Sequence, residues 1–237
     1  DDITDTPTVS GIETINFTTS ATSLGGDLEF DVNLLNISGS NLINFENTNS
    51  SSAIVTLDIT NVASALSLGS HFTAAKLAAQ DDSDIVLELS SDMTLTTTGS
   101  SQDLTVNAGG KSVTLDASTA AGTIAINNAN IVDIDTISSG DNLTIVANGN
   151  VSVDDASQLE GNINIRSGGT IDITNATTSM GTLTLSNDRA PDGSDVTLTN
   201  TNSFGNVSIS SVGSITATAN NGLAGASMIS ATAAEDS

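Results

Sequence analysis

The chain contains no cysteine, tryptophan or tyrosine, and only two prolines and four basic residues among its 237 positions. Without cysteine, disulfides, thiolate metal sites and cysteine nucleophiles are excluded. Because aromatic residues make up only 2% of the chain, the core has to be built from Val, Ile, Leu and Ala, which suit a narrow, layered interior. No apolar run approaches the roughly 20 residues of a transmembrane helix, so we expect no membrane insertion.

The scarcity of basic residues leaves the chain strongly acidic. Asp and Glu number 28 against four Lys and Arg, for a formal net charge of −24. Nucleic acids and anionic lipids are bound through Lys and Arg, so we expect neither as a partner. The acidic residues are spread along the chain and not gathered in a tail, which indicates a charged folded surface that attracts divalent cations.

The chain is dominated by a repeat with a period of about 20 residues. Each unit holds two short runs of alternating apolar and polar residues around a turn that carries Gly or Asn. The leading runs open on Leu104, Ile124, Leu143, Ile163, Leu183 and Val207. The second runs open on Val113, Ile131, Val151, Ile171, Val196 and Ile215. Glycines close the units in step, at Gly122, Gly140, Gly161, Gly181, Gly205 and Gly225. The one long interval contains NDRAPDGSD, which indicates an insertion in a turn.

This pattern predicts an all-β fold, a parallel β-solenoid (β-helix) in which each unit forms one coil of about 20 residues. Strands of successive coils would pair about 4.8 Å apart, with Val, Ile and Leu inward and Thr, Ser, Asn and Asp outward. Gly and Asn would supply the positive φ that tight corners need. Because one coil cannot bury its own apolar face, stability would come from stacking. Two stacked β-sandwich domains are the competing interpretation.

The first part of the chain is less regular, so we expect two regions that meet near residues 80–92. Residues 1–90 would form an irregular β region with a short capping helix, and residues 91–237 the regular solenoid repeats. The helix is predicted near residues 70–80, in GSHFTAAKLAAQ, with Ser70 as its N-cap and Phe72, Ala75 and Leu77 on its apolar face. A wider core is expected in this half because it holds four of the five phenylalanines, Phe17, Phe30, Phe45 and Phe72.

Two Asp-rich segments offer the hard oxygen ligands that calcium prefers. The segment QDDSD supplies Asp81, Asp82 and Asp84, and NDRAPDGSD supplies Asp188, Asp192 and Asp195. The alternative is that these residues are solvated turn residues, because Asp is common in turns. Neither segment matches the EF-hand loop or the glycine-rich nonapeptide of calcium-bound repeats. We predict calcium as the bound ion, with these six residues as its ligands.

Catalytic constellations are poorly represented in the chain. His71 is the one histidine, so a Ser-His-Asp triad would have to use it, whereas a surface or cap histidine is the competing role. A β-helix that cleaves polysaccharides needs two carboxylates held across a cleft. Sugar clefts also tend to use aromatic and basic residues, which are scarce here. We therefore expect no enzyme activity, no catalytic residues and no organic cofactor, with a carbohydrate-active β-helix as the less favoured alternative.

The phrase SGIETIN at the start of the chain, followed by Thr- and Ser-rich strands, resembles repeats of bacterial surface-layer proteins exported by type I secretion. The acidic, cysteine-free and nearly lysine-free composition is similar as well. This resemblance implies an extracellular structural protein of the bacterial cell surface that self-associates into a sheet or filament in a calcium-dependent way. The units from Leu143 onward are also similar to the repeats of filamentous-haemagglutinin-type adhesins. That second resemblance implies the alternative, a stalk or binding module of a secreted adhesin with cell-surface polysaccharide as a candidate partner.

Overall fold

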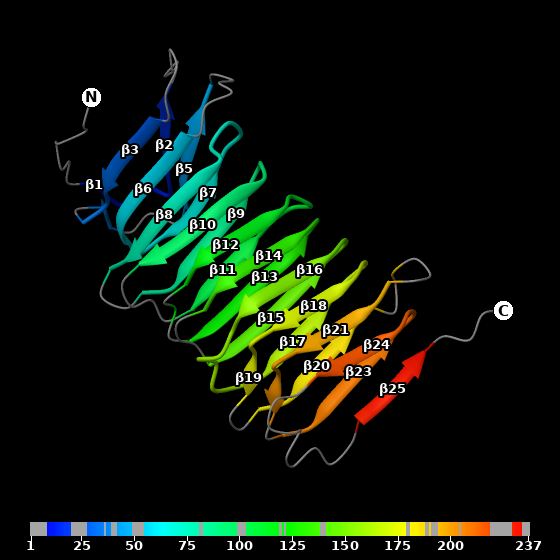
Figure 1. The fold of residues 1–237 in the computed structure, drawn as a ribbon. Helices are drawn as coiled ribbons and strands as arrows, with labels where there is room; N and C mark the ends of the chain where they lie inside the picture. Colours follow the sequence, from blue (N-terminus) through cyan, green and yellow to red (C-terminus); the bar gives the residue numbers. More distant parts are fainter. Residues whose placement is uncertain are drawn as a thin grey trace.

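The structure is a computed structural model that describes residues 9–19, 28–35, 37–38, 42–48, 55–80, 83–98, 103–118, 120, 122–137, 141–178, 181–187, 190, 194–203, 205–218 and 229–233. Within these residues the chain winds along one axis, so that strand follows strand from one end of the molecule to the other (Figure 1). Two long sheets, here called sheet 1 and sheet 2, form two sides of every coil.

Sheet 1 has 11 strands. In spatial order they are β2 (Thr14–Thr19), β5 (Leu42–Asn47), β7 (Ala65–Leu68), β9 (Ile85–Leu89), β11 (Leu104–Asn107), β13 (Thr123–Ala129), β15 (Asn142–Ala147), β17 (Ile163–Arg166), β20 (Leu183–Ser186), β23 (Val207–Ser211) and β25 (Ile229–Ala233).

Sheet 2 has 10 strands, and its order also follows the chain. They are β3 (Leu28–Asn33), β6 (Val55–Val62), β8 (Ala74–Ala79), β10 (Met93–Thr98), β12 (Val113–Ala117), β14 (Val132–Thr136), β16 (Val151–Asp155), β18 (Ile171–Thr174), β21 (Val196–Thr199) and β24 (Ile215–Thr218).

A short third side completes some of the coils. There β1 (Val9–Ser10) pairs with β4 (Ile37–Ser38), and β19 (Thr177–Thr178) pairs with β22 (Asn202–Ser203). Isolated parallel bridges join Ser118 to Ile137 and Ala156 to Ala176. These short contacts close the interior between the two long sheets.

All pairings between the described strands are parallel. A β-sandwich is built from antiparallel strands, so the sandwich interpretation is wrong. The all-β parallel β-solenoid with roughly 20 residues per turn is confirmed.

The register between coils is the one that the repeat predicts. In sheet 1 each residue that opens a leading run is paired with the one that opens the next: Leu104, Ile124, Leu143, Ile163, Leu183 and Val207. In sheet 2 the same holds for Val113, Val151, Ile171, Val196 and Ile215, but the residue paired between Val113 and Val151 is Val132. Ile131, which was predicted to open that run, is 44% exposed. The insertion in NDRAPDGSD lies between β20 and β21 and leaves both registers intact.

Strand alternation separates core from surface. In β15, for example, Leu143 and Ile145 are fully buried, whereas Val146 between two inward residues is 41% exposed. One continuous core of Val, Ile, Leu and Ala results, with identical or similar side chains stacked from coil to coil. Asn adopts positive φ, as predicted, between strands at Asn175 and Asn200. It also does so at Asn61 in β6 and Asn128 in β13, where the strand register shifts.

The helix predicted near residues 70–80 is wrong. Residues 74–79 form β8, which pairs with β6 on one side and β10 on the other. Ala75 and Leu77 point into the core and Lys76 points outward, which is a period of two. Alanine favours a helix, but the two flanking strands offer main-chain hydrogen bonds and a buried face that override this propensity. Ser70 and His71 lie in a turn, where His71 has φ 74°.

Four phenylalanines meet at the end of the solenoid formed by the first coils. Phe17 stacks on Phe45 with ring centroids 5.0 Å apart, and Phe30 meets Phe72 edge to face at 6.5 Å. Both long sheets continue across residues 80–92, because β8 pairs with β10 and β9 pairs with β11. The division into regions 1–90 and 91–237 stays a prediction.

Candidate functional site

The outer faces of the two sheets differ in charge. The strands of sheet 2 carry eight carboxylates on their outward side: Glu29, Asp31, Asp58, Asp116, Asp133, Asp135, Asp154 and Asp172. The described strands of sheet 1 carry three charged residues, Glu46, Glu88 and Arg166. We call the outer surface of sheet 2 the acidic face; it is the first candidate for cation binding.

At one end of the acidic face, three carboxylates from two adjacent strands come together. Glu29 and Asp31 on β3 and Asp58 on β6 have oxygen atoms within 4.8 Å of one another. Burial raises the pKa of Asp58, and the charges of Asp31 and Glu29 raise it further, against the opposing effect of Lys76. This arrangement is electrostatically unfavourable unless a proton or a cation joins it.

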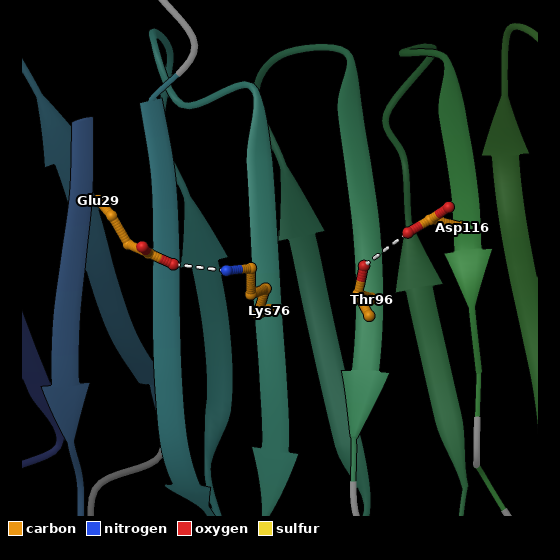
Figure 2. A network of polar contacts seen from close by, with 4 residues as sticks. All are labelled: Glu29, Lys76, Thr96 and Asp116. Carbon is orange, nitrogen blue, oxygen red and sulfur yellow. Dashed lines mark hydrogen bonds and ion pairs between the residues drawn. The ribbon is translucent and has the colours of Figure 1, made fainter. Parts of the chain in front are cut away.

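Lys76 on β8 is the cation that the structure places beside this group. Its Nζ lies 2.5 Å from Glu29 Oε1, and the two side chains reach toward each other over the intervening strand (Figure 2). The hydrogen bond with Glu29 raises the pKa of Lys76. Both side chains are about half exposed, so solvent screens this ion pair and it adds little to stability.

A second group of carboxylates lies further along the acidic face. Burial raises the pKa of Asp135 on β14, and Asp133, Asp116 and Asp154 raise it further by repulsion. Asp116 also accepts a hydrogen bond from the hydroxyl of Thr96 on β10 at 3.4 Å (Figure 2). No basic side chain lies on the described strands β10, β12, β14, β16 and β18. The repulsion between these carboxylates is therefore not offset by a Lys or Arg on the same strands.

This repulsion predicts how stability depends on pH. A carboxyl whose pKa is raised by folding binds protons more readily when folded, so the free energy of unfolding falls as the pH rises above the ordinary value of 3.8. We expect the melting temperature in EDTA to fall as the pH rises above 3.8, and Asp135→Asn to flatten this slope. Thermal unfolding followed by circular dichroism measures both, with Glu88→Gln on sheet 1 as the control. Equal slopes for the two variants would contradict the assignment.

Of the residues predicted as calcium ligands, only two of the six fall within the described chain. Asp81, Asp82, Asp188 and Asp192 lie outside the described residues. Asp84 precedes β9 in sheet 1 and Asp195 precedes β21 in sheet 2, so these two are not brought together. Their oxygens accept hydrogen bonds from backbone amides of the next coil. Asp84 Oδ1 accepts a hydrogen bond from the Asp103 N–H at 3.2 Å, and Asp195 Oδ1 accepts one from the Ser214 N–H at 2.8 Å.

The same bond between coils recurs at several other positions where Asp or Asn precedes a strand. Asp103 Oδ1 accepts the Thr123 N–H at 2.6 Å, and Asp92 Oδ1 accepts the Ser112 N–H at 2.8 Å. Asn150 Oδ1 accepts the Thr170 N–H at 3.0 Å. A side-chain acceptor at this position therefore caps the amide at the equivalent corner of the following coil. Such a repeated role explains Asp84 and Asp195 without a metal ion.

His71 has a local structural contact. Its Nδ1 lies 2.8 Å from the carbonyl oxygen of Asn47 and 3.4 Å from the Ser70 hydroxyl. A ring nitrogen that donates to a carbonyl cannot also accept the proton of a serine. No carboxylate among the described residues is hydrogen-bonded to His71. A triad that uses His71 gains no support from this geometry.

Comparisons with protein-family models, with curated proteins and with solved structures found no match. The described part of the chain contains no helix with the length and hydropathy to cross a membrane.

Proposed function

We propose that the chain is a structural segment of an extracellular, self-assembling bacterial surface layer, whose rods associate through calcium. The observation that carries this proposal is the acidic face, where like charges stand in rows on a stiff scaffold with few cations beside them. Calcium is a hard cation that binds several carboxylate oxygens and tolerates a variable coordination geometry.

The scaffold suits a mechanical role. Every coil is hydrogen-bonded to the coils before and after it through two continuous sheets, and Asp and Asn side chains add bonds between corners. A repeat structure of this kind resists bending because its contacts are all between neighbours and are repeated along the axis. The polar outer faces are presented along the length of the rod, where lateral contacts between copies can repeat with the coil period.

The charge explains why calcium would control assembly. Two copies that approach through their acidic faces repel each other, and salt screens this only partly at short range. A divalent ion held by carboxylates of both copies replaces that repulsion with attraction. Glu29, Asp31 and Asp58 are the group best placed to start such a bridge, since their oxygens already lie close together.

Calcium titration followed by light scattering tests this proposal. We expect Asp133→Asn/Asp135→Asn to raise the calcium concentration needed for assembly several-fold, because it removes two charges from the acidic face. The matched control is Glu46→Gln/Glu88→Gln, which removes two charges from sheet 1 and should leave the calcium requirement unchanged. Assembly that persists in EDTA, or equal shifts in the two variants, would overturn the role of the acidic face.

A further inference from the structure

The outer face of sheet 1 carries two oppositely charged residues in one column. Glu88 on β9 pairs in register with Asn107 on β11, which pairs with Asn127 on β13. The pairing of β13 with β15 places Val146 next in the column, and Val146 pairs with Arg166 on β17. Asn107 Nδ2 donates a hydrogen bond to Glu88 Oε1 at 2.6 Å and so holds the carboxylate in the column. Glu88 and Arg166 therefore lie four strand spacings apart, about 19 Å, on opposite sides of β13.

A second copy of the chain, turned over onto this face, presents the same column in reverse order. Consider a two-fold axis that lies between the two faces, runs parallel to the strands and passes over β13. This axis reverses the order of the strands but keeps each column opposite itself, so β9 of each copy faces β17 of the other (Figure 1). Glu88 then lies opposite Arg166 twice in the pair, once for each copy. Because the two charges are placed symmetrically about β13, this face is complementary in charge to itself.

The same two-fold axis keeps like charges apart along the edge of the face. Asp84 and Asp103 are exposed beside β9 and β11, and Asn142 and Asn162 occupy the equivalent positions beside β15 and β17. In the pair, Asp84 faces Asn162 of the second copy, and Asp103 faces its Asn142. A carboxylate there meets an amide, which can donate a hydrogen bond, and does not meet another carboxylate.

Two hollows on this face lie to one side of β13 and add complementarity of shape. The smaller, about 180 Å³, is lined in part by Arg166, so it opens where Glu88 of the second copy arrives. The larger, about 460 Å³, crosses β13, β15, β17 and β20, and all of its lining side chains are Thr or Asn. In the pair it faces β13, β11, β9 and β7 of the second copy, which places Val86 of that copy opposite Asn164. The hollows of each copy therefore receive side chains of the other.

The area of the face is sufficient for a stable pair. Since β13 is the sixth of the 11 strands in sheet 1, the two-fold axis overlaps the faces over all of these strands. With strands about 4.8 Å apart and about five residues of about 3.3 Å in each strand, the face covers roughly 900 Å² per copy. Stable complexes bury about 800 Å² per partner. The two acidic faces point away from each other on the outer sides of the pair, where their repulsion is weakest.

We propose that two copies of the chain pair through the outer faces of sheet 1, antiparallel about β13, with Glu88 of each copy bound to Arg166 of the other. This pairing needs no calcium, but its place in a layer rests on the function proposed above. A calcium-bridged contact between two acidic faces uses the same patch on both copies and so closes at two copies. Alternation of that contact with the sheet 1 contact extends the assembly beyond a pair.

Sedimentation velocity of the full chain, in EDTA and at physiological salt, tests the pairing. The charge-reversal variants are Glu88→Arg, Arg166→Glu and the exchanged variant Glu88→Arg/Arg166→Glu. The control is Asp133→Arg on the outer side of sheet 2, which changes the net charge by the same amount as Glu88→Arg. Circular dichroism confirms that all four variants keep the β fold.

We expect the unmodified chain to form a dimer whose fraction rises with protein concentration. Each single reversal places like charges opposite each other twice and should raise the dissociation constant of the dimer at least about 10-fold. The exchanged variant should restore pairing, because the same ion pairs form with their signs exchanged. The control should pair at least as well as the unmodified chain, since it reduces the overall repulsion. Glu88→Gln removes an attraction without adding a repulsion, so it should weaken pairing much less than Glu88→Arg.

The pairing and the calcium-driven layer can fail separately. A chain that stays monomeric in EDTA, an exchanged variant that pairs no better than the single reversals, or a loss of pairing in Asp133→Arg would overturn the pairing. Dimers that form only in calcium would also overturn it, without contradicting the layer. Dimers that form in EDTA and do not assemble further after calcium is added would support the pairing and contradict the layer.

Discussion

Ile145→Asp is expected to unfold the middle of the solenoid. Ile145 is 0% exposed and pairs in register with Ile126 in one neighbouring coil and Ile165 in the other. An aspartate here places a carboxyl without a partner in an apolar core, so we expect the free energy of unfolding to fall by at least about 5 kcal/mol. Urea denaturation followed by circular dichroism measures the loss.

The matched control for this variant is Val146→Asp, one position further along β15. Val146 is 41% exposed on the outer face and pairs with Arg166 of the next coil. The same new side chain is solvated there and faces a cation, so the change should stay below about 1 kcal/mol. Successive residues of a strand face opposite sides, so equal losses at the two positions would show that the register of sheet 1 is wrong.

Gly181→Ala is the second substitution with a large expected effect. Gly161, Gly181 and Gly205 stack at the corner that precedes the sheet 1 strands, and a Cβ at Gly181 would overlap the carbonyl oxygen of Gly161. A Cβ at Gly205 would meet the carbonyl oxygen of Gly181 in the same way. Since the obstacle is backbone, the coils themselves would have to separate. We expect a loss of about 3 kcal/mol, measured by urea denaturation.

Gly110→Ala separates the close contact from the loss of backbone freedom. Gly110 has φ 84°, and a Cβ there meets nothing within 4 Å. Its substitution should cost about 1 kcal/mol, from the left-handed conformation alone. If Gly181→Ala were no more costly than Gly110→Ala, the close stacking of the glycine corners would be contradicted.

The repeat predicted the register between coils because the core admits only one alignment of the apolar residues. Leu143 opens its unit in the sequence, and it pairs with Ile124 and Ile163 in the structure. A shift by one residue would point these side chains to solvent. The glycines at the corners follow from the same logic, because Gly161 and Gly181 stand at equivalent positions of adjacent coils.

The helix assignment failed where two periods fit one segment. In residues 69–80, Phe72, Ala75 and Leu77 satisfy a helical face, but Ala75 and Leu77 also satisfy an alternating strand. Local propensity favoured the helix because alanine is abundant there. The strands β6 and β10 decided the outcome, since each pairs in parallel with five of the six residues of β8. That information is non-local and is absent from the segment itself.

The sequence did not predict the candidate site, because its clearest acidic pattern is the runs of Asp in QDDSD and NDRAPDGSD. The structure brings Asp58 together with Glu29 and Asp31, although Asp58 is distant from them in the chain and meets them only because β3 and β6 pair. The available signal was alternation: Glu29 and Asp31, like Asp133 and Asp135, sit two residues apart on strands and so share a face. Asp84 and Asp195 instead cap the next coil.

Electron micrographs of the purified full chain, first in EDTA and then in millimolar calcium, test whether calcium drives assembly through the acidic face. We expect separate particles in EDTA, because the acidic faces repel, and ordered sheets or filaments after calcium is added. Particles that stay separate in calcium, or sheets that form equally well in EDTA, would contradict calcium-dependent assembly through the acidic face.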